Sequence, residues 1–133
     1  GVVRLTATLS GLAGSVYDRA IIAFELDHGG ATEPLLERAR AAWATRPDAV
    51  GRDLVAWALH RLGRDDEAWS ESEAARATGA ADARLLFHAG AIAAARGEDP
   101  TARTLLGRAL DLGPALDPAA RAEASELLAT VTP

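Results

Sequence analysis

The fold is decided by a short stretch, LGRDDEA at residues 62–68, which recurs 34 residues later as RGEDPTA at residues 96–102. In both copies a glycine is followed two positions later by an aspartate and five positions later by an alanine. The same offset separates Gly79 from Gly113. Glycine readily takes the positive φ that ends a helix, so the stretch predicts a unit of helix, turn and helix that is written twice.

Residues that suit helix starts recur at about half that period. The side chains of Ser, Thr and Asp accept hydrogen bonds from the free amides of a helix's first turn. Such residues lie at intervals of 16 to 18 positions: Ser15, Thr32, Asp48, Asp65, Asp82, Asp99 and Asp117. This spacing predicts helix pairs at about residues 15–48, 49–82 and 83–116, and a last helix at about 117–131.

The apolar residues agree with this division. Between the turns they recur at three- and four-residue steps, as on the buried face of a helix, and no stretch alternates like a strand. The chain is 49% hydrophobic but only 5% aromatic, and alanine is its commonest residue, which suits closely packed helices. We therefore predict one all-α domain over residues 1–133, in which residues 1–14 are interpreted as the remnant of a preceding repeat.

Composition argues against several classes of function. No cysteine is present, so disulfides and thiolate metal sites are excluded, and the net charge of −5 disfavours a nucleic-acid surface. No apolar run approaches the roughly 18 residues that span a bilayer. The three histidines, His28, His60 and His88, lack the spacing of a zinc pair. No glycine loop suited to binding phosphate is present. We expect a protein without enzymatic activity, metal or cofactor; a cytoplasmic location is favoured, and an export signal upstream of Gly1 stays open.

A 34-residue unit of two helices resembles the tetratricopeptide repeat. Residues 62–68 and 96–102 resemble that family's turn between paired helices, and Pro114 matches its closing proline. Residues 53–59 and 87–90 are similar to the C-terminal repeats of bacterial, especially actinobacterial, members. The resemblance implies a right-handed superhelix of antiparallel helix pairs with a concave groove, closed by a capping helix.

The family also places small residues where its helices approach each other closely. Ala56 and Gly90 stand at that position, whereas Ile22 occupies it in the first pair. Glycine within a helix costs about 1 kcal/mol relative to alanine, so Gly90 predicts that another helix passes close by.

In this family the first helix of each pair lines the groove. The residues that would face it are Arg19, Ala23, Leu26, Asp53, Trp57, His60, Arg61, Arg84, Phe87, Ala91 and Ala94. The partner-binding candidates among them are Arg19, Asp53, Trp57, His60, Arg61, Arg84 and Phe87. Aromatic and arginine side chains are the usual anchors of protein interfaces, so the resemblance implies a passive module that binds a peptide or a helix of another protein.

Alternatives stay open at this stage. Trp57 and Phe87 could pack against a neighbouring helix instead, in which case Trp57→Ala would cost much stability. Trp43 and Trp69 fall on second helices and are interpreted as filler between repeats. Some members of the family bind a terminal carboxylate, for which the stand-ins here are Arg19, Arg84 and His88.

The competing class of function is self-association. A repeat array that is cut at an end exposes an apolar face, which could pair chain with chain and give a homodimer rather than a monomer. The residues that would form such a contact are Val2, Val3 and Leu5 at one end and Leu127, Leu128 and Val131 at the other.

Overall fold

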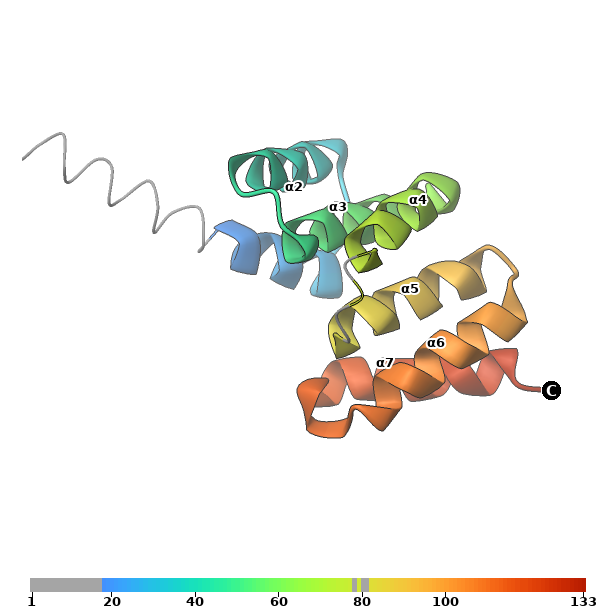
Figure 1. Cartoon of the computed structure of the whole chain (residues 1–133). Coiled ribbons are helices and arrows are strands. Elements are labelled where there is room, and N and C mark those ends of the chain that lie inside the picture. The colour runs from blue at the N-terminus through green and yellow to red at the C-terminus, as the bar shows by residue number, and fades with distance from the viewer. Residues whose placement is uncertain (1–17, 78, 80–81) are drawn as a thin grey trace, which may run out of the picture.

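The computed structural model describes residues 18–77, 79 and 82–133, and its regular elements are all helical (Figure 1). No strand occurs in this part of the chain, which confirms the predicted all-α fold. The predicted helix start at Ser15 and the remnant at residues 1–14 lie outside the described residues. A helical segment at residues 18–28 precedes six α-helices: α2 (Glu33–Thr45), α3 (Ala49–Arg61), α4 (Asp65–Arg76), α5 (Ala83–Ala95), α6 (Asp99–Asp111) and α7 (Pro118–Val131).

Successive helices pack against each other. Contacts join each helix from α2 to α6 with the next one in the chain. The odd-numbered helices also touch, since α3 contacts α5 and α5 contacts α7. Figure 1 shows the resulting stack of helical hairpins, with α7 lying beside α5 and α6. This arrangement is that of a helical repeat, in which α7 takes the place that the first helix of a further pair would have.

The turns between helices repeat with the period read from the sequence. Gly63 and Gly97 have φ values of +81° and +76°. In both turns the glycine amide donates to the carbonyl three residues back, and the next amide donates to the carbonyl five residues back. These two hydrogen bonds satisfy carbonyls that the helix end would otherwise leave free. Gly79 and Gly113 also share a positive φ, of +77° and +59°.

Four of the predicted helix caps are confirmed. The side chains of Thr32, Asp48, Asp82 and Asp117 each accept a hydrogen bond from a backbone amide of the first turn that follows. This local chemistry sets the start of α2 and of the odd-numbered helices α3, α5 and α7.

The predictions for Asp65 and Asp99 are wrong. The chain passes from the glycine turn into the helix within two residues, so Arg64 and Glu98 hold the cap position and make no side-chain capping bond. Asp65 and Asp99 are instead the first helical residues, where the positive end of the helix dipole stabilises a carboxylate.

Gly90 marks the closest approach of α5 and α6. A Cβ atom at Gly90 would lie 2.7 Å from both Cγ and Cδ2 of Leu106, and 3.2 Å from the Leu106 backbone nitrogen. The prediction that another helix passes close to this glycine is therefore confirmed. Ala56, one period earlier, is fully buried, and Ile22 is equally buried in the first pair, where the packing accepts a larger side chain.

Trp43 and Trp69 fill space between neighbouring hairpins, as expected. Both are partly buried against the hydrophobic core. The guanidinium of Arg52, on α3, lies 5.2 Å from the Trp43 ring centre, and that of Arg96, at the end of α5, lies 5.3 Å from Trp69. Each tryptophan on an even-numbered helix thus meets an arginine of the following helix.

Candidate functional site

The seven predicted partner-binding residues divide by exposure. His60, Arg61 and Arg84 are half-buried and reach the surface. The other four are buried, with exposed fractions of 8% or less: Arg19, Asp53, Trp57 and Phe87. Leu26 and Ala91, which were also expected to face the groove, are buried as well. The contact between α3 and α5 places Trp57 against Phe87 and His88 and so covers rings that a more open groove would expose.

Trp57 lies at the centre of an aromatic cluster. Its ring stacks on His88 with centres 3.9 Å apart and on His60 at 5.0 Å, and Phe87 lies 5.7 Å away in a tilted arrangement. The Arg61 guanidinium sits 4.7 Å from the Trp57 ring centre. The structure therefore brings together the expected aromatic and cationic residues, but Trp57, with an exposed fraction of 0%, has the packing role.

A carboxylate that the sequence analysis did not select ties this cluster together. Asp27, near the end of the 18–28 segment, accepts a hydrogen bond from Trp57 Nε1 at 3.0 Å through Oδ1. Its other oxygen accepts from Arg84 Nη2 at 3.1 Å. Asp27 thus joins the first, second and third helix pairs. Its partners are 30 and 57 residues away in the sequence.

His88 and Asp53 form a second, deeper polar contact. His88 Nδ1 donates to Asp53 Oδ2 at 2.8 Å, and the two side chains are only 2% and 5% exposed. Removal of one partner from a buried polar pair is costly, because the other is left buried and unpaired. Asp53 Oδ1 has no hydrogen-bond partner among the described residues. The pair can hold an imidazole in a fixed orientation, and here that imidazole is stacked on Trp57.

Arg19 is a structural clamp. Its Nη2 donates to the backbone oxygens of Ala42 and Arg46 at 2.8 and 2.7 Å, at the end of α2. Its Nη1 donates to Asp48 Oδ1 at 2.9 Å. A Cβ on Gly51 would meet the guanidinium at 2.8–3.0 Å, so this glycine makes room for it. Arg19 therefore joins the 18–28 segment to the α2–α3 connection, which accounts for its burial.

This clamp predicts a pH dependence. Burial opposes ionisation of Asp48, but hydrogen bonds from Arg19 and the Gly51 amide outweigh it and lower the pKa of Asp48 below its usual value of about 3.9. The ionised carboxylate therefore stabilises the fold above pH 4, and this contribution is lost as the pH falls through the lowered pKa. Asp48→Asn should make stability less dependent on pH below about pH 4.

Thermal unfolding between pH 7 and pH 2.5 measures the effect. Asp111→Asn is the matched control, because Asp111 is exposed and makes no side-chain hydrogen bond among the described residues. Equal acid sensitivity of the Asp48→Asn variant and this control would contradict the role given to the clamp.

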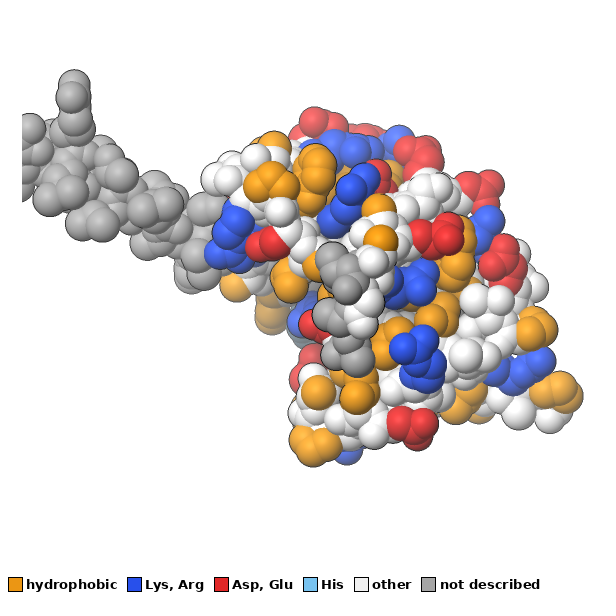
Figure 2. Space-filling view, in the orientation of Figure 1, with side chains coloured by type: hydrophobic (Ala, Val, Ile, Leu, Met, Phe, Trp, Pro, Cys, Tyr) orange, Lys and Arg blue, Asp and Glu red, His pale blue; other side chains and the backbone are white. Residues whose placement is uncertain are grey.

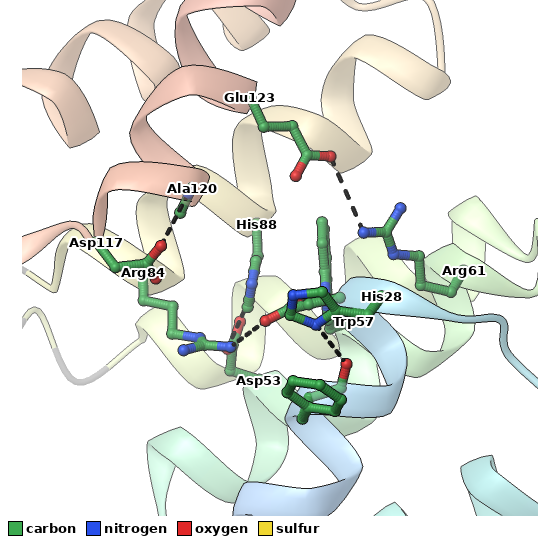
Figure 3. Close-up of polar contacts among 11 residues, drawn as sticks. His28, Asp53, Trp57, Arg61, Arg84, His88, Asp117, Ala120 and Glu123 are labelled. Carbon is green, nitrogen blue, oxygen red and sulfur yellow. Dashed lines mark hydrogen bonds and ion pairs between the residues drawn. The ribbon is translucent and has the colours of Figure 1, made fainter.

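A cavity of about 260 Å³ lies where the 18–28 segment, α5 and α7 meet. Its walls carry three carboxylates, one guanidinium, two imidazoles and apolar atoms. Figure 3 labels most of the polar members: His28, Arg84, His88, Asp117 and Glu123. The lining residues are Asp27, His28, Arg84, Phe87, His88, Asp117, Ala119, Ala120 and Glu123. Of the predicted binding residues, this cavity collects Arg84 and Phe87.

A second cavity, of about 380 Å³, lies along α5 and α7. Most of its lining is small or apolar: His60, Ala91, Ala94, Ala95, Asp99, Glu123, Leu127, Thr130 and Val131. Glu123 lines both cavities, so they adjoin. Together they form the candidate binding surface, which we call the α5–α7 groove.

Within the described residues, no group of three His, Cys, Asp or Glu side chains could hold a metal ion, and no helix is long and apolar enough to cross a membrane. His60, at the edge of the groove, is engaged by an aspartate, since its Nδ1 lies 2.6 Å from Asp65 Oδ1. The chain matches no protein-family model, and searches of curated proteins and of solved structures find no similar protein.

Proposed function

We propose that this chain is a non-catalytic binding module of the tetratricopeptide type, which receives a peptide or a helix of another protein in the α5–α7 groove. Its helix pairs then follow a right-handed superhelix. The observation that carries the proposal is the pair of adjoining cavities along α7, which reach Arg84 and Phe87 and offer both charged and apolar walls. Binding sites of this kind combine an apolar lining with a few fixed polar groups.

The regular turns support the family assignment. The positive φ values at Gly63 and Gly97, and at Gly79 and Gly113, recur with the 34-residue period of that repeat. The rigid network beneath the groove supports binding, because a preorganised surface loses little conformational freedom when a partner docks. In this module Arg84 lies at the face that the partner meets, whereas Trp57 holds the groove wall in place.

Selection of displayed random peptides on the immobilised domain tests the proposal. Selected peptides should shift the amide resonances of α5 and α7 in NMR spectra, and Arg84→Ala should change their affinity. Arg108→Ala is the control, since Arg108 is an exposed arginine on α6 that lines neither cavity. Selected peptides that map to the outer helices α2, α4 and α6, or a selection that yields none, would contradict a groove function.

The apolar end of α7 makes a further prediction about oligomeric state. Leu127 and Leu128 already pack against the core, and Val131 is 6% exposed, so α7 caps the stack from within the chain. We expect light scattering to report a monomer, and Leu128→Glu to lower stability by weakening this packing. A dimer at all accessible concentrations that Leu128→Glu dissociates would favour the self-association alternative.

A further inference from the structure

The groove has a consistent sign of charge. Four carboxylates line its two cavities: Asp27, Asp99, Asp117 and Glu123. Arg84 is the one arginine in the lining of these two cavities. The one arginine is already committed, since it donates to Asp27 at 3.1 Å. On the face drawn in Figure 2, by contrast, arginine and acidic side chains are mixed over the surface of α2 and α4.

Glu123 is the carboxylate that the two cavities share. It lines both cavities, its side chain is 42% exposed, and it accepts no hydrogen bond from another described residue. Its nearest cation is Arg61, whose Nη2 is 4.0 Å from Oε1, beyond hydrogen-bond distance. Asp117 uses Oδ1 to cap α7 through the Ala120 amide.

The two histidines add acceptors. His28 Nδ1 lies 2.9 Å from the Phe24 carbonyl, which can only accept, so this nitrogen carries the hydrogen. His88 Nδ1 likewise donates to a carboxylate, at 2.8 Å. In the neutral rings each Nε2 is then an acceptor, and neither has a hydrogen-bond partner among the described residues. His88 is 2% exposed and lines the cavity, so its ring is a buried polar group beside this space.

A wall made of acceptors and carboxylates suits a cation with several N–H donors. Guanidinium carries five such donors in a plane, pairs with carboxylates through two bonds, and stacks on aromatic rings. Phe87, which lines the cavity, supplies an aromatic ring there. The neighbouring cavity, lined by alanines, Leu127 and Val131, fits a small apolar side chain beside the cation.

From this complementarity we infer that the α5–α7 groove selects a basic peptide, and that the cavity between residues 18–28, α5 and α7 takes an arginine side chain of that peptide. The inference rests on the proposed binding function and names the chemistry of the partner. Glu123 and Asp117 contact the guanidinium, and the second cavity takes the apolar residue that flanks the arginine.

The test uses three capped pentapeptides of sequence Ala-Leu-X-Ala-Ala, in which X is arginine, citrulline or glutamate. Citrulline keeps the shape of arginine but lacks its charge. NMR titration of the labelled 133-residue domain should give at least tenfold tighter binding for the arginine peptide than for the citrulline peptide, with shifts at Arg84, Ala120 and Glu123. Raising the salt concentration should weaken this binding.

Glu123→Gln should lower the affinity for the arginine peptide about fivefold, as expected for one partly exposed ion pair. Glu126→Gln is the matched control on the same helix, because Glu126 is exposed and lines neither cavity. Circular dichroism of both variants checks that the fold is intact.

Equal affinity for the arginine and citrulline peptides would overturn the inference, as would the absence of binding by all three. Preference for the glutamate peptide in the same groove would also overturn it, while leaving the proposed binding function in place. Failure of the random-peptide selection would, separately, remove the function itself.

Discussion

Trp57→Ala should reduce the free energy of unfolding by about 3–5 kcal/mol, the usual cost of removing a large buried aromatic side chain. Trp57 is 0% exposed and lies among two histidines, Phe87 and the Arg61 guanidinium. The variant would leave a cavity at the contact between helix pairs and would leave Asp27 Oδ1 without its donor. Urea denaturation followed by circular dichroism measures the loss.

Two variants separate the contributions. Trp57→Phe keeps an aromatic ring but removes the hydrogen bond to Asp27, so we expect a smaller loss of about 1–2 kcal/mol. Trp69→Ala, at a partly buried tryptophan on α4, should cost less than Trp57→Ala. A loss below about 1 kcal/mol for Trp57→Ala would place its ring at the surface and restore it as a candidate anchor for a partner.

The second large effect is expected at Gly90. Alanine is the better helix former by about 1 kcal/mol, so helix propensity alone predicts that Gly90→Ala stabilises the protein. The added methyl group would instead lie 2.7 Å from Leu106 Cγ and 3.2 Å from its backbone nitrogen, so α6 itself must move. We expect the substitution to destabilise the fold by about 1–3 kcal/mol, as overpacking does in well-filled cores.

Gly107→Ala, on the facing helix α6, should change the free energy of unfolding in the opposite direction. A Cβ at Gly107, within α6, would meet no atom within 4 Å among the described residues beyond its chain neighbours and the nearby backbone of its own helix. It should therefore raise the free energy of unfolding by about 0.5–1 kcal/mol. Thermal or urea denaturation of both variants gives the comparison, and stabilisation by both would show that α5 and α6 are not in close contact at Gly90.

The features that were predicted well from the sequence depend on contacts between residues that are close together in the chain. A capping side chain such as Asp82 acts on amides two and three positions away, and the turn at Gly63 closes within five residues. Gly90 was also informative, because a glycine within a helix has few other reasons to be there. The cap predictions for Asp65 and Asp99 were wrong because a tight glycine turn moved the start of the next helix by one residue.

The candidate site was predicted less completely, for a physical reason. Helical periodicity says which side of a helix a residue occupies, but it does not say how closely the next helix covers that side. The expected groove residues Trp57 and Phe87 therefore lie beneath the surface. Asp27 and the His88–Asp53 pair were missed because their partners come from other helix pairs, and no local pattern marks a contact over 30 residues or more.

The bridge made by Asp27 has a consequence for cooperativity. In a chain of stacked repeats each unit normally contacts only its immediate neighbours, so local unfolding can begin at either end. One carboxylate here couples the first hairpin to the third as well as to the second, over 57 positions. Fraying of the amino-terminal hairpin would thus release a restraint on α5, and amide exchange in these distant segments should rise together rather than in sequence.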